Sequence, residues 1–392
     1  MMWLYFILRS AGMKILICNL GIGGGGAERV LIDFLSYWLR ESQMGGGDIN
    51  PKSDIDLFLI EKKKQDTYLH WCEEHLHKVF TFPHIFGKVR FLNKFWKRRV
   101  LRNPTLINYF IKEQYDVNIG FLEGISTIYI SQKQGGKKIG YIHIALNEMR
   151  EGKRDKAELE AYLRLDSIIC VSNYVKDSLL KLYPQLSHKH IEVIYNPIDK
   201  DGIMQKSLAH DIQKDNFVFM QVGRLTYQKG LITLLEANKI LQDKGYNYEI
   251  WLLGEGERYK KELDSILAAQ NVSNVRFLGF HSNPYPFMKI CDVMVLASYF
   301  EGYGLVLAES CVLGKPIIAS DIPTSKEILY NENLGECGMF FESKNAYALA
   351  QVMEAMYNAK DTREKFAAQA LAHSQSFDVA RSIKQLEGLL QG

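Results

Sequence analysis

Two glutamates stand eight positions apart around a glycine-rich turn in the segment EGYGLVLAES, which runs from Glu301 to Ser310. The apolar run VMVLAS precedes it and GKPIIAS follows it, which predicts a strand, a tight turn, a helix, a glycine stop and a second strand. Backbone N–H groups of Gly302–Val306 would face an anion where the helix begins, and Glu309 would lie about two turns further along. We therefore expect this segment to suit a ligand such as a sugar nucleotide.

A second segment, VGRLTYQKG, places two cations five positions apart at the end of the predicted strand 217–224. Arg224 offers a planar fork of donors and Lys229 a compact point charge, so together they suit a diphosphate without a metal ion. A solvated turn is the alternative for this pair. Glycines also stand at this strand end and at two later ones, where small residues would admit a ligand: Gly223, Gly254 and Gly279.

A third glycine-rich turn, GIGGGGAERVL, follows the predicted strand 14–20 and opens a helix with an apolar face. Gly24 and Gly25 allow close backbone approach, and the helix would present its N-terminus to an anion. Tight packing is the alternative explanation of such a turn. A dinucleotide-dependent dehydrogenase is disfavoured because no acidic residue ends the second strand in the ribose-binding context, and no Walker pattern occurs.

One histidine, His143, lies near the end of the predicted strand 137–144 in the sequence GYIHI. A lone histidine in an apolar strand is commonly a core residue, and contact with a ligand is the other interpretation. The other nine histidines form no ligand pattern, and no DxD pair or HExxH helix occurs in the expected setting, so we predict no metal ion and no cofactor. The cysteines lack metal-ligand spacing and are expected to be buried thiols: Cys18, Cys72, Cys170, Cys291, Cys311 and Cys337.

The stretch 86–103, FGKVRFLNKFWKRRVLRN, is strongly basic, contains no acidic residue and is interleaved with aromatic and aliphatic side chains. Such a basic amphipathic pattern suits an anionic membrane surface and an acceptor that is itself linked to a lipid. A solvated helix whose aromatics cover the domain core is the alternative. No recognised motif supports nucleic-acid binding. The residues assigned to this membrane and acceptor patch are Arg90, Lys94, Trp96, Lys97, Arg98 and Arg99.

The chain has 392 residues, of which 47% are hydrophobic and 24% charged, with a formal net charge of +3. A chain of this size buries large cores and is expected to form two domains. The small net charge argues against nucleic acid as a partner of the whole protein. No run reaches about 18 apolar residues, so we predict no transmembrane helix. The initial MMWLYFIL is shorter and lacks a basic n-region and a cleavage site.

Nearly continuous apolar runs alternate with helix-period segments, which predicts two parallel sheets, each covered by helices on both faces. The strands expected in the first half are 14–20, 54–60, 77–82, 116–123, 137–144, 166–172 and 190–197, and those in the second are 217–224, 248–256, 275–280, 293–298, 316–321 and 338–342. We predict an extension over 1–12, a Rossmann-like domain over 13–197, a second over 198–375, and a final amphipathic helix over 376–392. A ligand would bind at the carboxyl ends of the strands.

Together these segments resemble the retaining GT-B glycosyltransferases of family 4, and the resemblance covers the chain from Met13 onward. The carriers are GGGGAERVL, GRLTYQKG, LLGEGE, VRFLGF and EGYGLVLAESCVLGKPIIASD, through their order and spacing. The GGAERVL form is similar to bacterial enzymes that add sugars to lipopolysaccharide, capsule or lipid-linked oligosaccharides. The resemblance implies two Rossmann-like doubly wound domains facing a central cleft, with the final helix packing back on the first domain.

The resemblance also implies roles for the residues that match the family's motifs. Arg224 and Lys229 would hold the donor diphosphate and stabilise charge on the leaving nucleotide. Glu309 would accept hydrogen bonds from the ribose, and Glu301 would lie close to the donor sugar. His143 would contact the transferred sugar. The other donor-binding positions would approach the phosphates or the sugar through backbone or small side chains: Gly24, Gly25, Gly223, Gly254, Gly279, Gly302, Tyr303, Gly304 and Leu305.

The activity implied is transfer of a hexose or N-acetylhexosamine, with retention, from a nucleotide-diphosphate sugar to a saccharide or lipid-linked acceptor in cell-surface polysaccharide biosynthesis. UDP is the nucleotide expected from the family, and the expected location is the cytoplasmic face of the cytoplasmic membrane as a peripheral protein. A nucleotide-sugar epimerase and a phosphorylase, which usually needs a lysine-bound cofactor, are alternatives on this fold. A non-catalytic subunit is disfavoured because Arg224, Lys229, Glu301, Glu309 and His143 are all present.

The basic stretch generates a prediction that liposome flotation tests directly. The protein should float with vesicles that contain anionic lipid and stay in the dense fraction with neutral vesicles, because lysine and arginine side chains are attracted to the negative surface. Replacing Arg98 and Arg99 by glutamine should weaken flotation, whereas replacing two lysines of the other domain, Lys239 and Lys260, should not. Equal flotation with both kinds of vesicle, none with either, or no loss of flotation on neutralising Arg98 and Arg99 would remove the membrane assignment.

Overall fold

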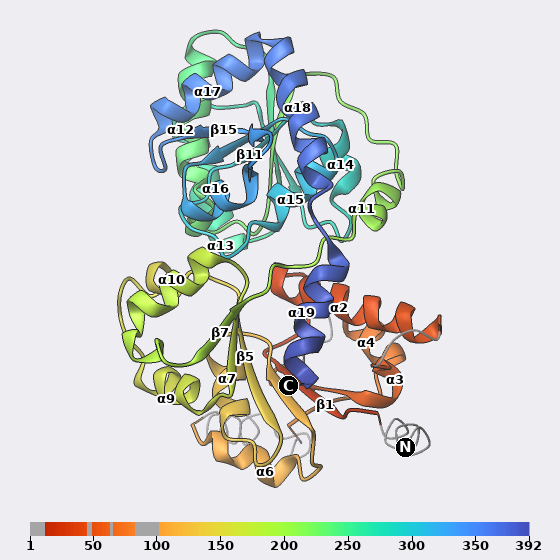
Figure 1. Ribbon diagram of the computed structural model, residues 1–392. Helices are drawn as coiled ribbons and strands as arrows, with labels where there is room; N and C mark the ends of the chain where they lie inside the picture. Colours follow the sequence, from red (N-terminus) through yellow and green to blue (C-terminus); the bar gives the residue numbers. More distant parts are fainter. Residues whose placement is uncertain (1–11, 45–48, 63–65, 83–101, 392) are drawn as a thin grey trace, which may run out of the picture. The chain divides into compact units, whose positions relative to one another are not determined.

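The computed structural model describes residues 12–44, 49–62, 66–82 and 102–391, and these belong to two compact units (Figure 1). The first unit consists of two segments, the chain up to Tyr195 and the C-terminal segment Arg381–Gly392. The second unit is Asn196–Ala380. The sequence pattern places the join after residue 197, close to this boundary. Each unit has its own sheet and is described by itself.

The first unit is built on a seven-stranded parallel sheet with the order β3-β2-β1-β4-β5-β6-β7. Every residue of β1, β2, β4 and β6 is buried, as expected for strands covered on both faces. Each strand lies inside a run predicted from the sequence. Their bounds are β1 Ile15–Asn19, β2 Ile55–Leu59, β3 Lys78–Thr81, β4 Val117–Gly120, β5 Lys137–Ile142, β6 Ser167–Cys170 and β7 His190–Val193.

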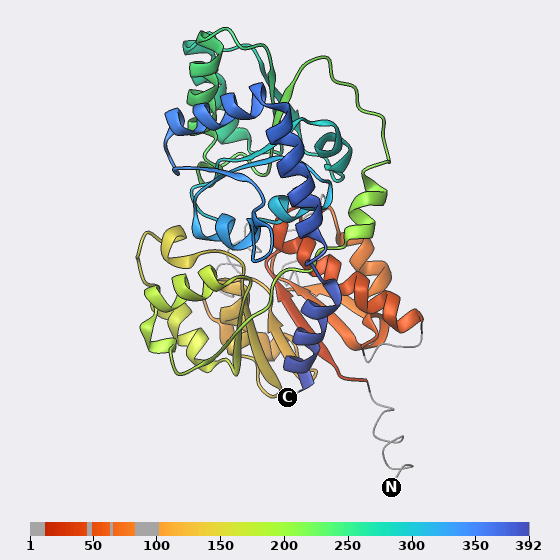
Figure 2. The ribbon, with the colours of Figure 1, turned by 45° about the horizontal axis from the view of Figure 1, so that its top comes forward.

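Helices connect these strands and lie on both sides of the sheet (Figure 2). The longest, α2, follows β1 directly and turns an apolar face with Val30, Leu31 and Trp38 toward the core. The helices of the first unit are α2 Gly26–Gln43, α3 Pro51–Asp54, α4 Leu69–His75, α6 Ile107–Phe110, α7 Ile125–Ser131, α8 Leu146–Met149, α9 Lys156–Arg164 and α10 Asn173–Leu182, with short 3-10 turns at Pro104–Leu106 and Pro184–Leu186.

The second unit is built on a six-stranded sheet, again parallel, with the order β10-β9-β8-β11-β12-β15. All six strands lie within predicted runs: β8 Val218–Val222, β9 Glu249–Leu253, β10 Val275–Gly279, β11 Val293–Leu296, β12 Ile317–Ser320 and β15 Met339–Phe341. A two-stranded antiparallel pair, β13 Tyr330–Asn331 with β14 Gly335–Glu336, is absent from the sequence predictions because four residues carry no usable period.

Helices sandwich this second sheet, and a core cluster fills the space between the sheet and two of them, α12 and α17, which lie side by side (Figure 1). Leu235 of α12 and Met353 of α17 meet Phe219 and Ile250 of the strands in this cluster. α15 and α18 pack together elsewhere in the unit. The helices are α11 Lys200–Lys206, α12 Leu231–Asp243, α13 Glu257–Ala269, α14 Tyr285–Ile290, α15 Leu305–Val312, α16 Pro323–Leu329, α17 Ala346–Asn358 and α18 Lys360–Ser374, with a 3-10 turn at Tyr227–Lys229.

The strand order reverses once in each sheet, between β1 and β4 in the first unit and between β8 and β11 in the second. At such a point the connections on the two sides leave in opposite directions, which opens a crevice at the carboxyl ends of the two strands. The glycine-rich turn follows β1, and the segments with Lys229 and Glu301 follow β8 and β11. The topology therefore places these segments where open α/β sheets bind ligands.

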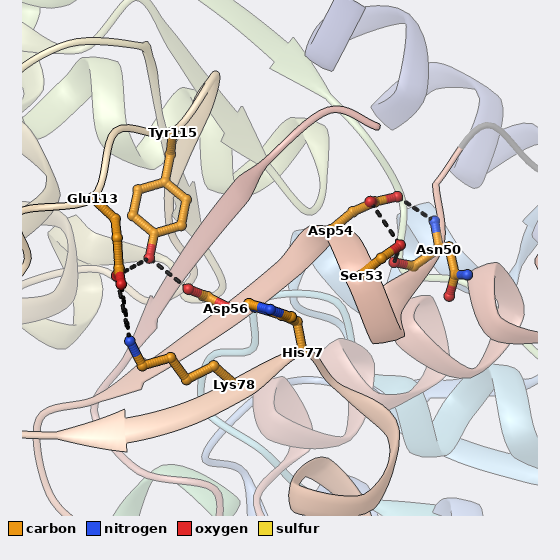
Figure 3. Close-up of polar contacts among 8 residues, drawn as sticks. All are labelled: Asn50, Ser53, Asp54, Asp56, His77, Lys78, Glu113 and Tyr115. Carbon is orange, nitrogen blue, oxygen red and sulfur yellow. Dashed lines mark hydrogen bonds and ion pairs between the residues drawn. The ribbon is translucent and has the colours of Figure 1, made fainter. Parts of the chain in front are cut away.

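A polar cluster lies at the opposite, amino-terminal ends of β2 and β3 (Figure 3). Asp56 is buried and accepts hydrogen bonds from the Tyr115 hydroxyl (2.6 Å) and from His77 Nδ1 (2.7 Å). The Glu113 carboxylate accepts from the same hydroxyl (3.2 Å) and from Lys78 Nζ (3.2 Å). Burial, together with Asp56, raises the pKa of Tyr115, which stays a hydroxyl donor. This cluster joins β2, β3 and the segment before β4, and we assign it to stability.

The last helix, α19 Val379–Gln391, returns to the first unit. Glu387 Oε1 accepts a hydrogen bond from the Trp38 indole Nε1 (2.9 Å), and Lys137 Nζ donates to the carbonyl oxygen of Leu389 (2.6 Å). Ile383 and Leu386 lie on the buried face of α19. The helix therefore closes the core of the first unit although it ends the chain.

A substitution in α19 tests this docking. Leu386→Ala removes a side chain that is 1% exposed and should lower the free energy of unfolding of the first unit by about 2–5 kcal/mol. Leu371→Ala, at a position 48% exposed on α18, should cost about 0.5 kcal/mol or less. Urea denaturation followed by circular dichroism and tryptophan fluorescence measures both. Equal effects of the two substitutions would contradict the docking of α19.

Candidate functional site

Two charged side chains form an ion pair at the point of strand reversal in the second unit. Lys229 ends the 3-10 turn after β8, and Glu301 follows β11, so their loops leave neighbouring strands. Lys229 Nζ lies 2.6 Å from Glu301 Oε1, and the two side chains are 16% and 9% exposed. Burying either charge without the other would be costly, so each fixes the other in place. The structure brings these two predicted site residues together.

Further hydrogen bonds orient the Glu301 carboxylate. The hydroxyl of Ser298 donates to Oε1 (2.6 Å), and Gln228 Nε2 approaches Oε2 at 3.4 Å. Thr324 donates its hydroxyl to the Glu301 carbonyl oxygen (3.1 Å). A carboxylate with this many donors is an acceptor held in one orientation, which suits positioning of a ligand better than proton transfer. The ammonium group of Lys229 keeps two further protons for another anion.

Arg224 stands in the same loop but is presented differently. It is exposed, and across the described residues it takes part in no ion pair. Its backbone neighbour Leu225 donates its N–H to the Glu255 carbonyl oxygen (2.8 Å), which ties this loop to the one after β9. The guanidinium thus has its five N–H donors directed to solvent or to a ligand from an anchored backbone. Its predicted role at a diphosphate stays a prediction.

The glycines at the strand ends have a packing role that the sequence did not reveal. A Cβ on Gly254 would overlap the carbonyl oxygen of Gly223, and a Cβ on Gly223 would lie 3.0 Å from Lys229 Cε. The loops after β8 and β9 therefore touch through these glycines, and the Lys229 stem lies over Gly223. Gly279 has nothing within 4 Å of the Cβ position and has a φ of +74°. Approach of a ligand to these three positions stays a prediction.

The helix after Glu301 begins later than the sequence indicated. Gly304 is the N-cap, with a φ of +73°, and α15 starts at Leu305. Glu309 is consequently about one turn into the helix, and the expectation of about two turns was wrong. The error arose because Gly302 and Tyr303 form a buried loop before the helix instead of its first residues. The first amides of the helix belong to Leu305 and the residues after it.

Glu309 is 2% exposed, and the hydroxyl of Tyr285 donates to its Oε1 (3.3 Å). Tyr285 opens α14, which follows β10, so the contact joins α14 to α15. A buried carboxylate that already accepts from a tyrosine is oriented for further hydroxyl donors. The prediction that such donors come from a ribose is compatible with this geometry and stays a prediction.

In the first unit, His143 follows β5 and stacks on Tyr141, with ring centroids 5.2 Å apart. Its Nε2 is buried and has no hydrogen-bond partner among the described residues, and burial lowers the pKa of the imidazole to about 3. The backbone N–H of His143 donates to Glu123 Oε2 (2.9 Å), and burial raises the pKa of that carboxyl group. His143 is therefore a neutral imidazole at pH 7 and suits hydrogen bonding to a neutral ligand such as a sugar.

The glycine-rich turn leads from β1 into α2, whose N-cap is Gly25 and receives no side-chain cap. The carboxylate of Glu28 folds back against Gly25, so that a Cβ there would overlap it. A carboxylate at this position interacts favourably with the helix dipole. Gly24 is exposed. The predicted roles of Gly24 and Gly25 at a donor stay predictions, and the sequence analysis did not single out Glu28.

Six predicted residues of the membrane and acceptor patch lie outside the described residues: Arg90, Lys94, Trp96, Lys97, Arg98 and Arg99. In the described part of the chain, no group of three or more His, Cys, Asp or Glu side chains is placed to hold a metal ion. No helix there is long and apolar enough to cross a membrane. All six cysteines are free and buried, as the sequence indicated.

Comparison with known proteins shows the family. Residues 66–201 match Glycosyltransferase Family 4, and residues 205–373 match Glycosyl transferases group 1. The crystal structure of Anabaena HepE in complex with UDP and glucose has a TM-score of 0.73 at 20% identity and covers 97% of this chain and 100% of that chain. This chain belongs to the family 4 glycosyltransferases of the GT-B fold. Sucrose-phosphate synthase from Thermosynechococcus elongatus shares the fold with a TM-score of 0.75 at 16% identity, over 97% of this chain and 98% of that chain.

Curated relatives of this family member include two Campylobacter jejuni proteins. One is an N-acetylgalactosamine-N,N'-diacetylbacillosaminyl-diphospho-undecaprenol 4-alpha-N-acetylgalactosaminyltransferase, 30% identical over 232 residues, which are 59% of this chain and 61% of the relative. The other is an alpha-1,4-N-acetyl-D-galactosaminyltransferase named for an undecaprenol-linked acceptor, 24% identical over 376 residues, 94% of this chain and 95% of the relative. The capsular polysaccharide glycosyltransferase CapM of Staphylococcus aureus is 29% identical over half of each chain. This chain thus spans about three fifths of the first relative's length.

Three residues of the candidate site were missed by sequence reasoning. Ser298 and Gln228 bond to Glu301, and Tyr285 bonds to Glu309. The first two lie inside segments that the sequence analysis did single out, VMVLAS and GRLTYQKG, so polar side chains within three positions of Glu301 or Lys229 were a usable signal. Tyr285 had no such signal, because its contact depends on how α14 packs against α15.

The neutral imidazole of His143 makes a prediction about acid stability. An unfolded histidine binds a proton below about pH 6.5, whereas the folded His143 does so only below about pH 3, so the folded state loses stability as the pH falls from 6.5 toward 3. The free energy of unfolding should therefore fall less between pH 7 and pH 5 in His143→Gln than in the parent protein, by up to about 2 kcal/mol.

Urea denaturation of the first unit at pH 7 and pH 5 measures this difference. His70→Gln, at a side chain that is 86% exposed, is the matched control and should keep the pH dependence of the parent protein. An unchanged pH dependence in the His143 variant would show that His143 is charged or solvated in the folded state.

Proposed function

We propose that this protein transfers a sugar from a nucleotide-diphosphate sugar, with UDP as the nucleotide, to a saccharide or lipid-linked saccharide acceptor in cell-surface polysaccharide biosynthesis. The observation that carries the proposal is the oriented Lys229–Glu301 pair at the strand reversal of the second unit, beside the exposed guanidinium of Arg224. The relatives support it, since two are named for undecaprenol-linked acceptors and a third for capsular polysaccharide.

The proposed chemistry depends on charge that develops in the transition state. As the bond from the anomeric carbon to the diphosphate oxygen breaks, negative charge gathers on the departing nucleotide. Arg224 and Lys229 would interact more strongly with the departing diphosphate in the transition state than in the ground state. This difference lowers the barrier. The acceptor hydroxyl then bonds to the anomeric carbon from the same face, and its proton passes to the departing phosphate oxygen. Retention of configuration is part of this proposal.

The carboxylates take positioning roles in this scheme. Glu301, held by Lys229 and Ser298, would accept a hydrogen bond from the donor sugar, and Glu309, held by Tyr285, would accept from the ribose hydroxyls. His143 is neutral and would hydrogen-bond the transferred sugar. We also propose that no metal ion is needed, because two cationic side chains at the diphosphate would supply the positive charge that a metal ion otherwise provides.

The acceptor proposal extends to the membrane. An undecaprenol-linked acceptor is embedded in a bilayer, so the enzyme would work as a peripheral protein at an anionic membrane surface on the cytoplasmic side. The basic stretch 86–103 is the part of the sequence that favours this placement.

Substitutions at the two cations test the proposed function. Arg224→Ala and Lys229→Ala should each lower turnover by a factor of about 100 or more, since one lost contact of this kind commonly costs on the order of 3 kcal/mol. Lys239→Ala and Lys260→Ala, at surface positions of the same unit, are the matched controls and should leave turnover unchanged. Circular dichroism confirms that each variant is folded.

The assay incubates the protein with radiolabelled UDP-sugars and a membrane extract. Transfer of label to lipid supports the proposal, and interconversion of the sugar without transfer would indicate an epimerase. Neither product, together with no thermal stabilisation of the protein by any nucleotide-diphosphate sugar, would indicate a non-catalytic role. Near-normal turnover in either alanine variant would refute the roles assigned to Arg224 and Lys229.

A further inference from the structure

β8 carries one polar side chain in the strand VFMQV, and that side chain, Gln221, is 3% exposed. A buried amide destabilises a protein core unless its polar atoms are hydrogen-bonded. Both ends of this amide have partners. Gln221 Nε2 donates to the carbonyl oxygen of Lys229 (2.7 Å), and Gln221 Oε1 accepts from the N–H of Ala297 (3.3 Å). One side chain of the sheet therefore joins the turn that carries Lys229 to the loop that leads to Glu301.

This bridge lies just beyond the point where β8 and β11 stop pairing. The last paired residues of the two strands are Met220 and Met294. Gln221 is the next residue of β8, and its side chain reaches the backbone of Ala297, directly after the end of β11. At a strand reversal the two chains must separate to open the crevice, which leaves backbone groups without a ladder partner. The amide of Gln221 supplies hydrogen bonds on both sides of that opening.

Other contacts join the turn that carries Lys229 to the loop that leads to Glu301. Tyr299 donates its N–H to the Gln228 carbonyl oxygen (2.8 Å), and Gln228 Nε2 donates to the Phe300 carbonyl oxygen (3.0 Å). Gly230, with a φ of +61°, approaches Ala297 so closely that a Cβ would overlap its carbonyl oxygen. These contacts join the turn to the loop, and Gln221 anchors both of them to the sheet. The Lys229–Glu301 pair thus depends on backbone positions on which Gln221 acts directly.

We propose that Gln221 is a positioning residue of the donor site, whose buried amide holds the Lys229 turn and the Glu301 loop at the separation that a nucleotide-diphosphate sugar requires. The assignment rests on the proposed function for the identity of the ligand, and on the hydrogen bonds alone for the geometry. An apolar side chain of equal size would fill the same space and leave the Lys229 carbonyl and the Ala297 N–H without this partner.

The test uses Gln221→Met, which keeps the size of the side chain and removes both hydrogen bonds. The matched control is Asn238→Leu, because Asn238 is also fully buried in the second unit and bonds to Asn274 Oδ1 (2.9 Å) and the Tyr248 hydroxyl (2.7 Å). Asn274 and Tyr248 directly precede β10 and β9, at the amino-terminal edge of the sheet and away from the site. Both variants lose a buried amide, so both should have a lower melting temperature.

Hydrogen–deuterium exchange and donor kinetics separate a positioning role from a merely structural one. In Gln221→Met, exchange should rise in 225–230 and 297–303, and kcat/KM for the donor should fall about tenfold or more at a temperature where the protein is folded. In Asn238→Leu, exchange in those segments and kcat/KM should match the parent protein. Equal losses of kcat/KM in the two variants, or unchanged exchange in both segments of Gln221→Met, would overturn the proposal.

Failure of the proposed function gives a different pattern. A parent protein that neither turns over nor is stabilised by any nucleotide-diphosphate sugar would refute that function. The exchange comparison between Gln221→Met and Asn238→Leu would still decide whether Gln221 holds the two segments together.

Discussion

The ion pair between Lys229 and Glu301 is the interaction on which the rest of the site depends. The two residues are 72 positions apart in the sequence, and they meet because β8 and β11 are neighbours at the reversal of the strand order. Two mostly buried charges at 2.6 Å must be matched, since either one alone would be strongly destabilising. The contacts of Ser298, Gln228 and the backbone around them hold the two charged side chains next to each other.

This constraint also limits the chemistry. A carboxylate whose Oε1 accepts from both an ammonium and a hydroxyl group is poorly suited to attack an anomeric carbon or to carry a proton. Glu301 is therefore unlike the catalytic acid or base of a hydrolase. In the proposed function, charge stabilisation is assigned to Arg224 and Lys229, of which the first is exposed and the second is held by Glu301.

The two sheets could be predicted from the sequence because buried parallel strands are continuous apolar runs. All seven strands of the first sheet and all six of the second lie inside predicted segments. The sequence placed the start of α15 too early, because Gly302 and Tyr303 are compatible with either a loop or a first helical turn. In the folded unit these two residues are packed as a buried loop, and the helix begins at Leu305. The pair β13–β14 was missed because two-residue strands have no period.

The sequence by itself determined the family, the α/β class and the residue types of the site, since these depend on local order and spacing: glycines after strands, Arg224 and Lys229 in one segment, and Glu301 and Glu309 in another. Only the tertiary structure decided that Lys229 and Glu301 are paired, that Gln221 bridges their loops, and that Trp38 and Lys137 hold α19 on the first unit. The physical reason is that these contacts join residues far apart in the chain. Their distances depend on strand order and helix packing, which no local pattern encodes.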